Sequence, residues 1–138
     1  MIMGALSLLL RNSEGGGIHF WCPGCDEAHM IRVRDDGIGD NSHWSYNLDP
    51  VKPTFRASIL VRGHDFTDKG RADYEAYYSI PEDQREPHPP GFRYDSYETV
   101  CHSFVTDGRI EFLSDCTHKL AGQTVDLPTF PGNEEELK

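Results

Sequence analysis

The chain has 138 residues, of which 37% are hydrophobic and 26% are charged. This is enough for one globular domain with a modest core, which a bound metal ion would help to stabilise. The formal charge of −10 argues against direct binding to nucleic acid, because phosphate contacts need clustered Lys and Arg side chains.

The first ten residues are mostly apolar. They lack the basic start and the small-residue cleavage site of a signal peptide, and the run is too short to span a bilayer. We therefore expect a first strand here, no membrane partner and a cytoplasmic location. In that compartment cysteines are more often metal ligands than disulfide partners.

Alternating hydrophobic residues and turn signals predict a mainly β chain. The dipeptide Asp107-Gly108 lies between two apolar runs and is typical of a two-residue hairpin turn, which would pair Thr106 with Arg109. The predicted strands are residues 5–10, 18–21, 29–33, 43–47, 55–61, 100–105, 109–113 and 124–127. We expect a single domain over residues 1–138, folded as a compact antiparallel sandwich or partial barrel.

Residues 64–98 differ in composition from this framework. They hold four of the nine prolines and five of the six tyrosines, and they are strongly acidic. We interpret them as a long insertion with one short helix over residues 72–78; loops of this length are usually functional or disordered. The acidic end, residues 129–138, is predicted to be a flexible tail.

The four cysteines predict a structural zinc site. The turn Cys22-Pro-Gly-Cys25 is the usual half of such a site, because two thiolates two residues apart can both face one tetrahedral ion. The predicted hairpin brings the other two cysteines to one side of the sheet. The expected ligands are Cys22, Cys25, Cys101 and Cys116, with His118 or His102 as a substitute for the fourth ligand and His29 as a weaker candidate.

Four thiolates would close the metal shell and leave no position for a reacting water. The sequence also lacks the His-Glu-x-x-His, Gly-x-Ser-x-Gly and P-loop motifs. The sequence therefore favours a protein that is not an enzyme. As an alternative, it could be a metal-dependent hydrolase or a small-ligand-binding protein that uses His102, Asp115 and His118 beside the metal.

Four segments occur in the order of a known family. The chain resembles a family of small tailed-phage and prophage proteins of unknown function, some of which carry an ammonia monooxygenase label that finds no support in these residues. The resemblance implies a phage origin and action in the cytoplasm of a bacterial host. The segments that carry it are residues 19–25, 52–61, 101–118 and 120–128.

From this resemblance and the acidic charge we expect a phage accessory protein that binds a host protein or nucleoprotein complex. Counter-defence of the anti-CRISPR kind is the expected purpose, with carboxylates in place of phosphates; a virion or assembly component is the alternative. The expected partner-binding residues are Tyr74, Tyr77, Tyr78, Glu82, Asp83, Glu86, Tyr94, Asp95, Tyr97 and Glu98.

Overall fold

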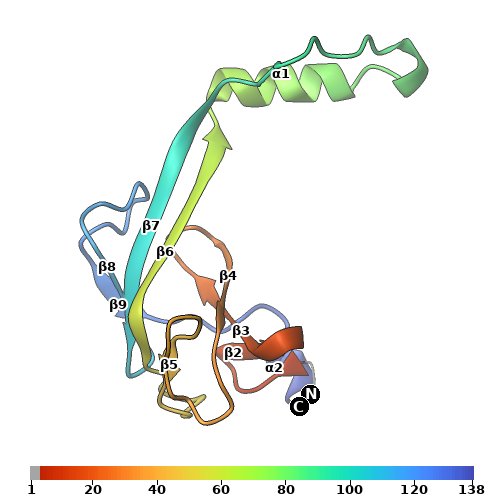
Figure 1. The fold of residues 1–138 in the computed structure, drawn as a ribbon. Coiled ribbons are helices and arrows are strands. Elements are labelled where there is room, and N and C mark those ends of the chain that lie inside the picture. Colours follow the sequence, from red (N-terminus) through yellow and green to blue (C-terminus); the bar gives the residue numbers. More distant parts are fainter. Residues whose placement is uncertain (1–3) are drawn as a thin grey trace. The chain divides into compact units, whose positions relative to one another are not determined.

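The computed structural model describes residues 4–138 and confirms a mainly β chain with two antiparallel sheets (Figure 1). The first sheet has the order β1 (Gly4–Ala5), β2 (Leu10–Ser13), β3 (Gly17–Cys22) and β4 (Glu27–Arg32). The second has the order β5 (Ser45–Tyr46), β6 (Phe55–Phe66), β7 (Ser96–Thr106), β8 (Arg109–Phe112) and β9 (Thr124–Asp126). The helices are η1 (Glu14–Gly16), α1 (Asp68–Tyr78), η2 (Glu82–Gln84) and α2 (Asn133–Glu136).

The hairpin between β7 and β8 has the predicted register. Thr106 lies opposite Arg109, and Ser103 lies opposite Phe112. Asp107 and Gly108 both have positive φ, 50° and 77°, as a two-residue type I′ turn requires. The register places the end of β8 beside the middle of β7, where the candidate site lies.

The predicted first strand over residues 5–10 is wrong, because the chain bends between β1 and β2. The Ser7 hydroxyl accepts hydrogen bonds from the backbone N–H groups of Leu9 and Leu10, at 3.1 and 3.2 Å. Serine side chains stabilise turns in this way, so a local polar contact outweighs the apolar character of the run. The start of that run, residues 1–3, lies outside the described residues.

One buried cluster holds the two sheets together within the unit formed by the chain up to Val61 and from Val100 onward. Phe20 of β3 stacks on Phe55 of β6 with ring centroids 6.2 Å apart. Along β7, Cys101, Ser103 and Val105 are buried in this core. Since successive side chains of a strand point to opposite faces, His102 lies on the face away from the core.

Residues 62–99 form a second compact unit. Helix α1 begins four residues before the predicted position, because the Thr67 hydroxyl caps it by accepting a 3.1 Å bond from the Gly70 N–H. Gly70 packs directly against the Asp95 backbone, where a Cβ would lie 1.9 Å from the carbonyl oxygen. Among residues 4–138, no helix is long and apolar enough to cross a membrane.

Candidate functional site

Three side chains far apart in the sequence meet on the outer face of the second sheet. The hydroxyl oxygen of Ser58 lies 3.0 Å from Nε2 of His102, and Nδ1 of His102 lies 3.1 Å from a carboxylate oxygen of Asp115. All three side chains are partly accessible; the His102 side chain is 26% exposed. The group is therefore ordered by contacts and still reachable from solvent.

The hydrogen-bond roles follow from the chemistry of the groups. An ionised carboxylate only accepts, so the proton of neutral His102 lies on Nδ1 and is donated to Asp115. Nε2 is then an acceptor, and the Ser58 hydroxyl donates to it. This is the Ser–His–Asp arrangement in which histidine acts as a general base toward a serine nucleophile.

The fold explains how these residues meet. Ser58 is on β6 and His102 is on the adjacent strand β7. Their neighbours Ile59 and Cys101 are buried in the core, so Ser58 and His102 point to the opposite face. Asp115 follows β8 in a short turn, and that turn brings its carboxylate over the histidine ring.

A cavity of about 220 Å³ borders Ser58. Its walls are the loop residues Asp40–Trp44 together with Ala57 and Ser58. The indole N–H of Trp44 donates a 3.1 Å hydrogen bond to the Ser58 carbonyl and so fixes the backbone that carries the hydroxyl. His43 lies 2.8 Å from the Asp40 carboxylate and lowers the pKa of Asp40, which keeps one wall anionic.

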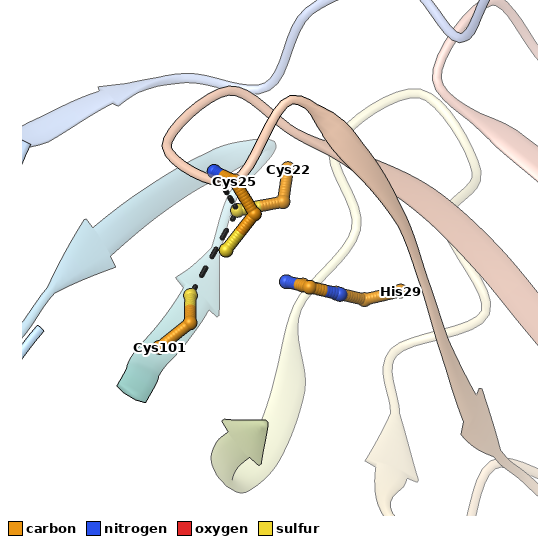
Figure 2. A group of neighbouring side chains, drawn as sticks. All are labelled: Cys22, Cys25, His29 and Cys101. Atoms are coloured by element: carbon orange, nitrogen blue, oxygen red, sulfur yellow. Dashed lines mark hydrogen bonds between the residues drawn. The ribbon is translucent and has the colours of Figure 1, made fainter. Parts of the chain in front are cut away.

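A second cluster lies on the opposite, core side of β7. The sulfur atoms of Cys22, Cys25 and Cys101 and a ring nitrogen of His29 all lie within 4.8 Å of one another. Figure 2 shows the three sulfurs and the histidine ring facing a common point. This group can hold a metal ion.

Hydrogen bonding within the cluster shifts the pKa values of two of its cysteines in opposite directions. The Sγ atoms of Cys22 and Cys101 are 3.8 Å apart. The hydrogen bond from Cys101 lowers the pKa of Cys22, and the same bond raises the pKa of Cys101. Nε2 of His29 is buried and has no hydrogen-bond partner among the described residues. A buried nitrogen that has no protein partner and lies beside three thiols is suited to bind a metal ion.

The structure brings three of the four predicted cysteine ligands together with His29, which was the weaker candidate. Cys116 is not a member of this four-residue group. Its sulfur is 3.2 Å from both the backbone N and the backbone O of His102. Cys116 also belongs to a group of three with Cys101 and His118. Nδ1 of His118 accepts a 3.2 Å bond from the Leu120 N–H, which puts the ring proton on Nε2.

The predicted partner-binding residues lie in the second unit. Tyr74, Tyr77, Tyr78 and Tyr94 form a cluster of aromatic contacts with Phe66, His88 and Phe92. Glu98 pairs with Arg62 at 3.0 Å, and an Asp95 carboxylate oxygen accepts from the Thr67 hydroxyl at 2.7 Å. Glu82 and Asp83 are the first two residues of η2. The backbone carbonyl of Glu86 accepts a hydrogen bond from the Tyr77 hydroxyl. The side chain of Tyr97 is exposed. Partner binding by these residues stays a prediction.

Ser58 is the residue of this candidate site that no sequence motif predicts. It lies inside an apolar strand with no glycine motif around it. The available signal is weak: Arg56 and Ser58 are polar at alternating positions, as expected for the exposed face of a strand. Only the pairing of β6 with β7 places the hydroxyl beside His102.

Comparison with known proteins gives one family. Residues 3–113 match the model of the family described as bacterial ubiquitination-like system serine protease (BubE). Neither the search of curated proteins nor that of solved structures gave a match. The matched range includes Ser58 and His102 and ends two residues before Asp115.

The match overturns the assignment to a phage protein family. The expected phage origin, host-virus interaction and anti-CRISPR-like counter-defence are wrong, as are the alternatives of a metal-dependent hydrolase and a virion component, because the matching family is one of serine proteases in a bacterial system. Since the family model matches most of the length of this chain, the chain belongs to the bacterial ubiquitination-like system serine protease (BubE) family.

Proposed function

We propose that this chain is a serine protease of a bacterial ubiquitination-like system, with Ser58 as nucleophile, His102 as general base and Asp115 as the residue that orients His102. The observation that carries the proposal is the pair of contacts on the two ring nitrogens of His102, 3.0 Å to Ser58 and 3.1 Å to Asp115. The family description supports the same chemistry.

The geometry supports acyl transfer in two stages. The Ser58 oxygen attacks the carbonyl carbon of the scissile bond while Nε2 of His102 takes the hydroxyl proton. His102 then gives that proton to the leaving group, and an acyl-serine forms. Water attacks the acyl group in the second stage, His102 again carries the proton, and Ser58 is regenerated. Asp115 stabilises the imidazolium that forms in both stages.

The test is a comparison of Ser58→Ala with Ser42→Ala in the hydrolysis of an activated ester such as p-nitrophenyl acetate. Ser42 lines the same cavity, so its removal controls for changes in the pocket wall. We expect the Ser58 variant to lose kcat by a factor on the order of 10⁶ and the Ser42 variant to stay near the wild type. Equal activity of the Ser58 variant and the wild type would refute the assignment.

We further propose that the metal held by Cys22, Cys25, His29 and Cys101 is a structural zinc ion. Thiolate and imidazole ligands in a Cys₃His set are typical of zinc. Two sulfurs bound at about 2.3 Å to a tetrahedral ion lie about 3.8 Å apart, and the Cys22 and Cys101 sulfurs are separated by 3.8 Å. Four protein ligands leave no open position, so the metal would stabilise the fold and take no part in catalysis.

Zinc content and X-ray absorption at the zinc edge test this proposal. We expect one zinc per chain in a shell of three sulfurs and one nitrogen. Chelation or Cys22→Ser should remove the ion and lower the free energy of unfolding by several kcal/mol, because the ligand set loses the ion that joins β3, β4 and β7. His29→Cys is the matched control and should keep the zinc. An all-sulfur shell that is lost in Cys116→Ser would instead support the cysteine set expected from the sequence.

A further inference from the structure

The backbone of His102 has an unusual partner. At the end of β8 the Leu113 N–H donates to the His102 carbonyl at 2.9 Å, so His102 directs its backbone polar groups toward this neighbouring segment. The chain then leaves the regular ladder, with the Cys116 N–H bonded to the Leu113 carbonyl at 3.2 Å. Backbone pairing with β7 resumes at Thr117, whose N–H donates to the Val100 carbonyl at 2.9 Å.

The thiol of Cys116 fills the gap that this turn leaves. The His102 N–H donates to the sulfur at 3.2 Å, and the thiol S–H donates to the His102 carbonyl at 3.2 Å. A thiol is both donor and acceptor, so a single side chain can bond both backbone groups of one residue. Cys116 is only 8% exposed, and a buried N–H without a partner would be costly.

The same turn therefore contacts His102 in two ways. Asp115 bonds the ring through Nδ1, and the next residue, Cys116, bonds the backbone. The Asp115 contact orients the ring toward Ser58, and the Cys116 contacts hold the backbone that carries the ring.

A metal-binding role fits Cys116 less well. Its group of possible ligands consists of Cys101, which is shared with the larger cluster, and His118. The Cys116 sulfur already bonds both backbone groups of His102. In His118, Nδ1 accepts from the Leu120 N–H, while Nε2 is buried and has no hydrogen-bond partner among the described residues.

We propose that Cys116 is a positioning residue that holds the backbone of His102 in the Ser58–His102–Asp115 triad. The proposal rests on the proposed protease function. Displacement of a catalytic group by a fraction of an ångström to about 1 Å can cost up to about 100-fold in rate. Loss of the thiol should therefore lower turnover more than substrate binding.

The experiment compares Cys116→Ala, Cys116→Ser and Thr117→Val, using p-nitrophenyl acetate hydrolysis and zinc content. Thr117 is the matched control, because it follows Cys116 and also bonds the backbone of β7. Its hydroxyl accepts a 3.1 Å bond from the N–H of Val100, not from that of His102. We expect Cys116→Ala to lower kcat by about 10- to 100-fold with KM nearly unchanged. Cys116→Ser keeps a donor and an acceptor and should recover part of that loss. Thr117→Val should stay within a few-fold of the wild type, and all three variants should retain zinc.

Three results would overturn the proposal: a Cys116→Ala variant with wild-type kcat, an equal loss in Thr117→Val, or loss of zinc from Cys116→Ala. If the alanine variant does not fold, Cys116→Val replaces it, and equal kcat values for the valine and serine variants would count against the proposal. A wild-type protein that neither hydrolyses the ester nor reacts with a fluorophosphonate would instead refute the protease function itself, and the positioning role with it.

Discussion

Asp115 shows how one exposed carboxylate can determine the chemistry of its neighbour. It accepts the Nδ1 proton of His102 and so selects the form of the ring whose Nε2 faces Ser58. Its side chain is 55% exposed, so the contact contributes little to folding, and the role proposed for it is catalytic.

This role gives a prediction for Asp115→Asn. An amide can donate a hydrogen bond to Nδ1 and so favours the wrong form of the ring, in which Nε2 carries the proton. We expect kcat to fall by a factor on the order of 10⁴ with the unfolding midpoint nearly unchanged. Asp126→Asn, which removes another exposed carboxylate paired with an Arg109 guanidinium, is the control and should have wild-type kcat. An Asp115→Asn variant as active as this control would be inconsistent with the triad.

The sequence predicts part of this site for physical reasons that can be named. If the protein is an enzyme, the sequence favours His102, Asp115 and His118 as site residues, because they lie close to predicted metal ligands in a polar segment; the structure places the first two in the triad. Cys22, Cys25 and Cys101 follow from ligand spacing and strand alternation. Ser58 could not be found in this way, since a serine in an apolar strand acquires its role only from the strand beside it.

At the scale of elements, the strongest sequence signals gave the correct structure. The Asp-Gly turn fixed the register of β7 and β8, because few residues tolerate positive φ at both central positions. The apolar run at the start gave the wrong prediction of a continuous strand over residues 5–10, since hydrophobicity alone does not reveal that Ser7 stabilises a turn.

Contacts between residues 5–11 and helix α2 join segments that are far apart in the sequence, and no local sequence pattern predicts them. Helix α2 lies against β1 (Figure 1). Buried Asn133 donates to the carbonyls of Ser7 and Leu10, at 2.8 and 3.0 Å. The Glu136 carboxylate accepts from the Ala5 N–H at 2.8 Å and also pairs with Arg11.

These contacts predict a pH-dependent contribution of Glu136 to stability. The hydrogen bond from Ala5 and the pairing with Arg11 lower the pKa of Glu136 below its usual value of 4.5. A lowered folded-state pKa means that the stabilisation is present above pH 4.5 and is lost as the pH falls through the lower folded-state value. Glu136→Gln should therefore have a lower denaturation midpoint at pH 7, and the difference from wild type should shrink in acid.

Urea unfolding at pH 7 and at pH 3 measures this difference. Glu135→Gln is the control, because Glu135 pairs with Lys138 within the same terminal segment. The interpretation fails if Glu136→Gln and Glu135→Gln give equal midpoints at pH 7, or if the Glu136 effect is as large at pH 3.

At the scale of the molecule, the two clusters share one strand. Cys101 faces the core and the metal-binding group, while the next residue, His102, faces Ser58 on the other side of the sheet. One bound ion on the core face would thus stabilise the strand that carries His102, the proposed general base. Composition and charge lead to the untested expectation that the chain does not bind nucleic acid, and they favour a bound metal. They carry no information about a triad whose members are separated by 44 and 13 positions.

The most direct test of the account is reaction of the purified wild-type protein with a fluorophosphonate, followed by mass spectrometry of its peptides. A Ser58–His102–Asp115 triad predicts one adduct, on Ser58, that forms slowly or not at all in Asp115→Asn and in the protein unfolded with urea. An unmodified Ser58, or an adduct on another serine formed equally fast in the unfolded chain, would contradict it.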